Sequence, residues 1–147
     1  MHPFPHVYRV SARGAGQGRV ILETDGVEPL ESSPPVEFDG PGDRWSPETL
    51  LLAALVDCFV LTFRAVARAA KLEWSDLAVS LEGTLDRPER VSQFTGFALH
   101  ATVTVAPGTG VDAAEAALAR AEKGCLISNS LKAPVHLATE VRVGEAY

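Results

Sequence analysis

Two cysteines are the residues of this sequence best suited to chemistry, and they stand in different settings. Cys58 lies within an apolar segment and precedes Phe59, whereas Cys125 directly follows Gly124 at the predicted start of a short helix. A free thiol has a pKa near ~8.5, so a reactive cysteine needs a nearby cation or a helix N-terminus to become a thiolate. The alternative for each is a small buried apolar side chain, and this applies most to Cys58 taken alone.

Other candidate groups give less support to other kinds of chemistry. His100 and His136 fall on the polar faces of predicted strands, and His2 and His6 lie near the N-terminus, so we interpret all of them as solvated side chains. No Cys or His spacing matches a zinc site, and the sequence has no GxSxG, GxGxxG or Walker-type loop. Hydrolase, nucleotide-binding and structural-zinc functions therefore lose most of their support, and we expect neither a metal nor a cofactor.

Composition and charge indicate one globular domain over residues 1–147. Hydrophobic residues make up 46% of the chain, enough for a core without disulfide or metal staples. The net charge is -6 and no basic cluster is present, which argues against binding to nucleic acid. The N-terminal sequence lacks the cationic start and long apolar run of a secretory signal, so we expect a cytoplasmic protein with reduced cysteines.

A long helix is predicted to carry Cys58. Ser46 is a typical N-cap, Pro47 suits the first helical position, and no breaker follows until about Lys71. At ~100° per residue the charged residues of this helix fall on one narrow stripe, formed by Asp57, Arg64, Arg68 and Lys71. The charges interrupt the apolar run of residues 50–70 and argue against a membrane span. One covering layer cannot bury the remaining apolar surface, so we expect a second subunit to cover it.

The other elements predict a two-layer α/β (α+β) fold. Strands are expected at residues 6–12, 19–24, 77–85, 97–105 and 135–143, the first two as a hairpin. Helices are expected at residues 111–123 and 126–132, and the Pro- and Gly-rich segment up to Gly42 as an irregular loop. Clean alternation along the last three strands indicates a sheet covered on one face, which favours antiparallel pairing. The long central helix should therefore pack on a largely antiparallel sheet.

Two motifs, 67 residues apart at their cysteines, together resemble one protein family. Residues 46–59, SPETLLLAALVDCF, contain a Pro-Glu pair and a helix-borne cysteine ten residues after Glu48. Residues 121–135, AEKGCLISNSLKAPV, contain a Gly-Cys-x-x-Ser motif followed by Leu-Lys near the last strand. Both motifs, and the order of strands and helices over essentially the whole chain, resemble the OsmC/Ohr family of osmotically inducible and organic hydroperoxide resistance proteins.

The resemblance implies an intertwined homodimer with two active sites at its interface and a thiol-dependent peroxidase activity toward organic hydroperoxides. Cys58 would be the peroxidatic thiolate, which becomes a sulfenic acid, and Cys125 the resolving thiol, which then forms a disulfide with it. A dithiol reductant, of lipoyl or thioredoxin type, would restore both thiols. Glu48 matches the family's acidic residue, which holds an arginine over the reactive sulfur.

That arginine is where the sequence departs from the family. The hairpin position used in one branch of the family is Gly16 here, and the loop position used in the other branch is Glu37. Arg44 or Arg19 could substitute for it, and the alternative for each is a solvated loop charge. We therefore expect Arg44 to complete the catalytic set with the two cysteines and Glu48.

Two functions of other classes compete with the peroxidase. The first is an OsmC-like relative without efficient peroxidase activity, acting as a small-ligand binding or redox-sensing dimer. The second is a purely structural dimer, which would require inert cysteines that lie far apart. The distance between the two sulfurs separates the structural dimer from the other two functions, and the rate of hydroperoxide consumption separates those from each other.

Helix geometry places a constraint on Glu48. Ten residues at ~1.5 Å each put Glu48 about 15 Å along the helix axis from Cys58, and the two side chains point about a quarter-turn apart. A glutamate side chain spans only a small part of that distance. If Glu48 acts on the thiol, we expect it to come from the partner subunit.

Overall fold

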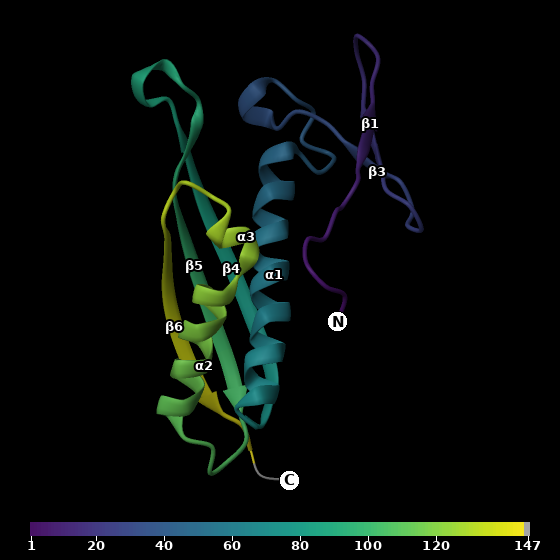
Figure 1. Ribbon diagram of the computed structural model, residues 1–147. Helices are drawn as coiled ribbons and strands as arrows, with labels where there is room; N and C mark the ends of the chain where they lie inside the picture. The colour runs from purple at the N-terminus through teal and green to yellow at the C-terminus, as the bar shows by residue number, and fades with distance from the viewer. Residues whose placement is uncertain (146–147) are drawn as a thin grey trace. The chain divides into compact units, whose positions relative to one another are not determined.

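The computed structural model describes residues 1–145, and the chain divides into two compact units. The first unit is Met1–Leu51 and the second begins at Leu52. Within the described residues each unit contains one three-stranded sheet, and the long helix α1 (Pro47–Ala69) begins in the first unit and continues through the second (Figure 1). The structure thus has the mixed α and β content and the long helix that the sequence patterns predict.

The first unit is built on the predicted N-terminal hairpin. Strands β1 (Ser11–Arg13) and β2 (Val20–Glu23) pair antiparallel, which confirms the hairpin with shorter strands than predicted. Strand β3 (Leu30–Ser32) and the 3-10 helix η1 (Val36–Phe38) lie in the segment predicted as an irregular loop. Strand β3 forms there because Leu30 pairs with β2 directly after Pro29, and a proline just outside a short edge strand removes no ladder hydrogen bond.

The ends of α1 follow from local sequence. The Ser46 Oγ accepts a hydrogen bond from the Thr49 N–H at 3.2 Å, and the Ser46 N–H donates to the Thr49 Oγ1 at 2.9 Å. This reciprocal pair is a capping box with threonine in the place of the usual glutamate. At the other end Lys71 has a φ of 54° and the Leu72 N–H donates to the Ala67 carbonyl, the bond of a Schellman motif. The predicted start and stop of the helix are confirmed.

The second sheet consists of β4 (Trp74–Asp86), β5 (Gln93–Val105) and β6 (Val135–Val143). Strands β4 and β5 are antiparallel, but β5 and β6 are parallel. The chain between β5 and β6 forms helices α2 (Val111–Gly124) and α3 (Leu126–Asn129), and such a helical crossover returns the chain in the same direction. Antiparallel pairing is therefore confirmed for β4–β5 and for the strands of the first unit, and the expectation of it is wrong for β6.

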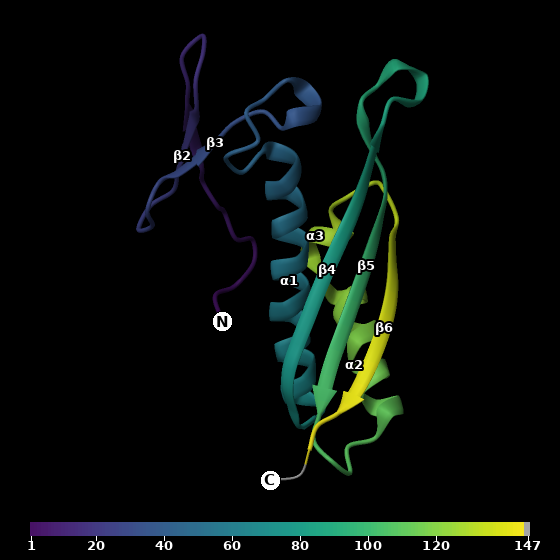
Figure 2. The same cartoon turned by 180° about the vertical axis from the view of Figure 1, so that it is seen from behind.

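The sheet of the second unit is covered on one face. Figures 1 and 2 show α1 and α2 on the same side of β4, β5 and β6, while the opposite side carries no helix of the second unit. His100 and His136 lie exposed on strands β5 and β6, as predicted from their polar-face positions. The alternation of apolar and polar residues along the strands therefore indicated how many faces of the sheet are covered. It did not determine the direction of β6.

The core of the second unit forms between α1, β5 and α2. Four residues of α1, spaced four apart, are fully buried: Leu55, Phe59, Phe63 and Ala67. They belong to the same core as alternate residues of β5 and the small residues of α2, namely Phe97, Leu99, Ala101, Val103, Val105, Ala114, Ala117, Leu118 and Ala121. Small side chains on α2 allow that helix to approach closely, which matters for the segment that follows it.

Much of the remaining surface of α1 is apolar and uncovered. Leu61 is 53% exposed, and only 22% of the helix's most apolar stretch is buried. With a mean hydropathy of 2.1 over that stretch, α1 is long and apolar enough to cross a membrane by length and composition alone. A helix at the centre of an assembly meets the same criteria of length and composition. Four residues of α1 are already buried in a protein core.

Candidate functional site

Cys58 lies on α1, one residue before the buried Phe59, and is itself only half-buried. One helical turn further along, the Thr62 Oγ1 lies 3.9 Å from the Cys58 Sγ. The same hydroxyl donates a hydrogen bond of 2.7 Å to the Cys58 carbonyl oxygen. The thiol thus stands at the edge of the core, with one side open to a reactant and a hydroxyl beside it.

Cys125 lies at the junction of α2 and α3 and is 1% exposed. Its backbone is extended, with φ -67° and ψ 108°, so it ends one helix and precedes the next. The Cys125 Sγ lies 3.9 Å from the carbonyl oxygen of Leu55, which is within the α1 turn that precedes Cys58. The predicted N-terminal position of Cys125 on a short helix is confirmed.

A close approach between helices brings the second cysteine to α1. A Cβ placed on Gly124, the residue before Cys125, would lie 3.3 Å from the Thr62 Cγ2. That spacing is tighter than a normal contact, so glycine lets the end of α2 pass next to the turn of α1 that carries Cys58. In the Gly-Cys pair of the second motif, Gly124 therefore serves the packing of the two helices, and Cys125 supplies the thiol.

The surroundings of Cys58 lower the pKa of its thiol. Burial alone raises that pKa, but hydrogen bonds to the sulfur outweigh the effect. In order of size they come from the Ile127 N–H, the Cys125 thiol, the Thr62 hydroxyl and the Leu126 N–H. Two of these donors are backbone groups in the first turn of α3, which have no partner within the helix and are free to bind a thiolate.

The pKa of Cys125 is shifted in the opposite direction. Burial raises it most, and hydrogen bonding to Cys58 together with the negative charge of a Cys58 thiolate raise it further, while the N–H groups of Ser128 and Ile127 lower it. The two thiols are close enough for each to affect the titration of the other. Cys58 is therefore suited to be the nucleophile, and Cys125 to remain a protonated thiol that donates to it. Both cysteines are free thiols in the structure.

Glu48 lies in the first turn of α1, within the first unit. Its Oε2 is buried and has no hydrogen-bond partner among residues 1–145. The two arginines considered for it are bound elsewhere: the Glu31 Oε2 accepts from the Arg19 Nη1 at 2.8 Å and from the Arg44 Nε at 3.2 Å. Arg44 also pairs with Asp43 at 3.4 Å. The catalytic role of Arg44 thus stays a prediction, as does that of Glu48.

A hollow of about 250 Å³ in the first unit contains Glu48. Apart from Glu48 it is lined mainly by apolar and small residues, which are Val20, Ser32, Ser33, Pro34, Pro35, Phe38 and Pro47. Ser33 is 4% exposed, and its Oγ likewise has no hydrogen-bond partner among residues 1–145. Two buried polar atoms in the first unit therefore remain unsatisfied by the described chain.

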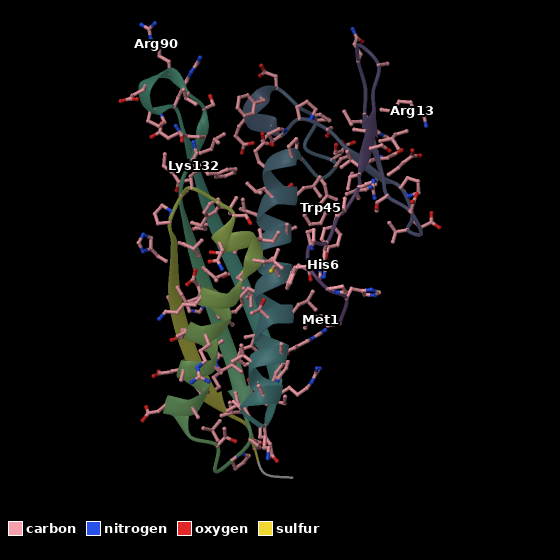
Figure 3. The ribbon with its side chains drawn as sticks, viewed as in Figure 1. Met1, His6, Arg13, Trp45, Arg90 and Lys132 are labelled. Atoms are coloured by element: carbon pink, nitrogen blue, oxygen red, sulfur yellow. The ribbon has the colours of Figure 1, made fainter. Side chains whose placement is uncertain are left out.

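Sequence reasoning overlooked Thr62 and two N–H groups beside Cys58, and in the first unit the carboxylate that pairs with Arg19 and Arg44. Thr62 could have been found, because a residue four positions after Cys58 on a helix lies on the same face. The N–H groups of Leu126 and Ile127 and the carboxylate of Glu31 gave no such local signal. Lys132 of the second motif lies in the loop that leads to β6. Arg90 lies within the connection between β4 and β5 (Figure 3). Among residues 1–145, no group of three or more His, Cys, Asp or Glu side chains is placed to hold a metal ion.

Comparison with known proteins identifies the family. The family model of OsmC-like proteins matches residues 40–140. The uncharacterized protein YmaD of Bacillus subtilis is 30% identical in an alignment of 114 residues that covers 74% of this chain and 75% of YmaD. Among solved structures, an organic hydroperoxide resistance protein OsmC of Legionella pneumophila is 31% identical, with a TM-score of 0.75 over 96% of this chain and 100% of its own.

A second solved structure shares the fold at lower identity. The OsmC-like protein VCA0330 of Vibrio cholerae, of unknown function, has a TM-score of 0.82 and 18% identity, covering 93% of this chain and 99% of its own. The family match spans both cysteines and Glu48. With its two sheets, its long helix and its paired thiols, this chain belongs to the OsmC-like protein family.

Proposed function

We propose that this protein is a thiol-dependent peroxidase that reduces organic hydroperoxides in the cytoplasm as a defence against oxidative stress. The observation that carries the proposal is the pairing of Cys58, whose pKa is lowered, with Cys125, whose pKa is raised. Such a pair supplies one nucleophilic thiolate and one protonated thiol at the same place. The similarity to the Legionella hydroperoxide resistance protein supports the same chemistry.

The proposed reaction has three balanced steps. The Cys58 thiolate attacks the terminal oxygen of the hydroperoxide, the O–O bond breaks, and the alkoxide leaves and takes a proton to become an alcohol. Cys58 is then a sulfenic acid. The Cys125 thiol attacks the Cys58 sulfur, the S–O bond breaks as the S–S bond forms, and the hydroxyl leaves as water together with the proton of the Cys125 thiol. A dithiol reductant of lipoyl or thioredoxin type then reduces the disulfide, becomes a disulfide itself and returns both thiols.

The surroundings of the two thiols favour a hydroperoxide with an apolar organic group. The side chain of Leu126, whose N–H faces the Cys58 sulfur, is 65% exposed, and Leu61 on α1 is 53% exposed. An alkyl or aryl group that reaches the thiolate would cover apolar surface there and gain hydrophobic free energy. Hydrogen peroxide has no such group, so it should react more slowly than an organic hydroperoxide.

We further propose that the working form is an intertwined homodimer. The uncovered apolar surface of α1 requires a partner, and a second copy of α1 presents the same kind of surface. Helix geometry separates Glu48 from Cys58 by about 15 Å along one α1, so Glu48 acts on the cysteine of the other chain if it acts at all. Each dimer would then contain two equivalent composite sites.

Consumption of cumene hydroperoxide by the reduced protein, followed by stopped flow, tests the proposal. The wild type should react rapidly with cumene hydroperoxide and more slowly with hydrogen peroxide. Cys58→Ser should react with neither. Cys125→Ser should still consume one equivalent and remain as a sulfenic acid that a nucleophilic trap labels. Slow reaction of the wild type with every hydroperoxide would overturn the proposal.

One observation favours a second function, in which a redox-sensing or small-ligand binding dimer keeps the fold without efficient peroxidase activity. Both candidate arginines are paired with Glu31, and the Glu48 Oε2 has no hydrogen-bond partner among residues 1–145. An arginine over the sulfur would orient the peroxide and stabilise the developing negative charge on the leaving oxygen. Slow hydroperoxide reduction combined with ready formation of the Cys58–Cys125 disulfide by a disulfide oxidant would favour this second function.

A further inference from the structure

Thr62 lies beside Cys58, and its hydroxyl has two acceptors within reach. It donates to the Cys58 carbonyl oxygen at 2.7 Å, and its Oγ1 lies 3.9 Å from the Cys58 Sγ. A hydroxyl carries one proton, so it donates to one of the two atoms at a time. We propose that Thr62 is a positioning residue, whose hydroxyl turns from the Cys58 carbonyl to the Cys58 sulfur when that sulfur becomes a thiolate. This inference rests on the proposed function, because it describes the same thiolate.

Redirecting the Thr62 hydroxyl costs little free energy, because the Cys58 carbonyl has another donor. In an α-helix the N–H of residue 62 already donates to the carbonyl of residue 58. The Thr62 hydroxyl is thus a second donor to an oxygen that is satisfied without it. Rotation about the Cβ–Oγ1 bond redirects the proton while the oxygen stays in place, so no rotamer change is needed. A charged acceptor shortens and strengthens such a bond.

The position of the hydroxyl is held by Gly124. The Thr62 Cγ2 lies on the side of Gly124, where a Cβ would come within 3.3 Å of it. Because the methyl group fills that gap, the hydroxyl of the same side chain stays on the side of Cys58. Threonine in a helix otherwise divides between two rotamers, and the one seen here combines this packing with the 2.7 Å bond from the hydroxyl to the Cys58 carbonyl. The second cysteine motif thereby orients a donor to the first cysteine.

The two protonation states of Cys58 have different hydrogen-bond patterns. In the thiol, the S–H donates to the Thr62 Oγ1 while the hydroxyl donates to the carbonyl. In the thiolate, the hydroxyl donates to the sulfur and joins the Cys125 thiol and the N–H groups of Leu126 and Ile127. The hydroxyl therefore favours the thiolate over the thiol and holds the sulfur in one orientation for attack. A valine in its place has the same shape and no proton to donate.

The test compares variants of Thr62 by the titration of Cys58. Thr62→Val and Thr62→Ala remove the hydroxyl, and Thr62→Ser retains it. Thr95→Val is the matched control, since the Thr95 hydroxyl also donates to a backbone carbonyl, that of Thr84, on an exposed strand. The pKa of Cys58 is measured from its ultraviolet thiolate absorbance and from the pH dependence of its alkylation, in the Cys125→Ser background and with both cysteines present.

We expect Thr62→Val and Thr62→Ala to raise the pKa of Cys58, so that the thiolate fraction near neutral pH falls about three- to tenfold. Thr95→Val should leave it within error of the parent, and Thr62→Ser, which keeps the hydroxyl but not the methyl group that orients it, should raise it by less than either variant that lacks the hydroxyl. An unchanged pKa in both variants that lack the hydroxyl would overturn the inference. So would an equal rise in Thr62→Ser, because loss of packing alone would then explain the effect. The titration uses no peroxide. It therefore tests the role of Thr62 independently of the peroxidase activity.

Discussion

The cysteine pair of the second unit and the Glu48 hollow of the first unit differ in how fully one chain satisfies their polar groups. Around Cys58, a thiol, a hydroxyl and two backbone N–H groups already face the sulfur. In the hollow, the Glu48 Oε2 and the Ser33 Oγ are buried without partners among residues 1–145. A single chain therefore supplies the donors around the Cys58 sulfur but, within residues 1–145, none for the Glu48 Oε2.

Electrostatics explains why this difference has consequences for assembly. The Glu48 Oε2 is buried without a hydrogen-bond partner among residues 1–145, and leaving such an acceptor unsatisfied costs about 1–3 kcal/mol. The two candidate arginines, Arg19 and Arg44, share the Glu31 carboxylate, which is itself partly exposed. We therefore expect a donor to reach Glu48 when the dimer forms. The following predictions test the contrast between a complete thiol pair and an incomplete carboxylate.

The largest expected effect is on chemistry at Cys58. Cys58→Ser should lower the rate of hydroperoxide reduction by about a thousandfold or more, because a serine hydroxyl is a far weaker nucleophile at neutral pH. Exposed-surface variants such as Thr95→Val serve as the control. Intact mass and peptide mapping should show that the wild type oxidises to a Cys58–Cys125 disulfide and that neither single cysteine variant does. A disulfide that forms only between chains would contradict pairing within one chain.

A large effect is also expected at the apolar surface of α1. Leu61→Glu should weaken the dimer by at least about tenfold in its dissociation constant, because dimerisation would bury an unpaired charge. Val91→Glu, a change at another exposed apolar residue in the β4–β5 connection, is the control and should leave the dimer intact. Sedimentation equilibrium gives both constants. A wild type that stays monomeric at micromolar concentration would refute the dimer.

Mixed dimers test whether Glu48 acts across the interface. A Cys58→Ser chain paired with a Glu48→Ala chain should retain one intact site, which combines the first chain's Glu48 with the second chain's Cys58, and so about half of the wild-type activity per dimer. The parent homodimers should both be impaired. A mixture no more active than its parents, from variants that fold and dimerise, would count against a site shared between subunits.

The two cysteines should differ in their reactivity with pH. A lowered pKa means that the Cys58 thiolate persists to lower pH than that of an ordinary cysteine, so alkylation of Cys58 should level off at lower pH. Cys125, with a raised pKa, should react only at higher pH and more slowly because it is buried. Mass spectrometry of alkylated peptides separates the two. Coincident profiles would contradict the division into nucleophile and proton donor.

The smallest expected effect is at the exposed ion pairs of the first unit. Glu31→Gln removes the shared partner of Arg19 and Arg44, and since these groups are partly exposed the free energy of unfolding should change by less than about 1 kcal/mol. Glu31→Gln should also raise the peroxidase rate if a released arginine can reach Glu48. Thermal or urea unfolding measures the first quantity. A large loss of stability would mean that Glu31 organises the unit.

The sequence by itself determined the features that depend on near neighbours along the chain. The capping residues Ser46 and Pro47 defined the start of α1, and the period of two in the strands showed which face of the second sheet is covered. The two cysteine motifs were recognisable for the same reason, since each is a short run of residues with fixed spacing. These signals are local, because helix caps and side-chain periodicity act over a few residues.

The tertiary structure decided what depends on distant parts of the chain. Strand β6 runs parallel to β5 because α2 and α3 cross over between them, and β3 forms because β2 offers it an edge. Glu31 takes both candidate arginines, and Gly124 brings Thr62, Cys58 and the first turn of α3 together. Each of these contacts joins residues at least ten positions apart or separate helices and strands. Their partners are selected by packing and charge in three dimensions, which no short stretch of sequence encodes.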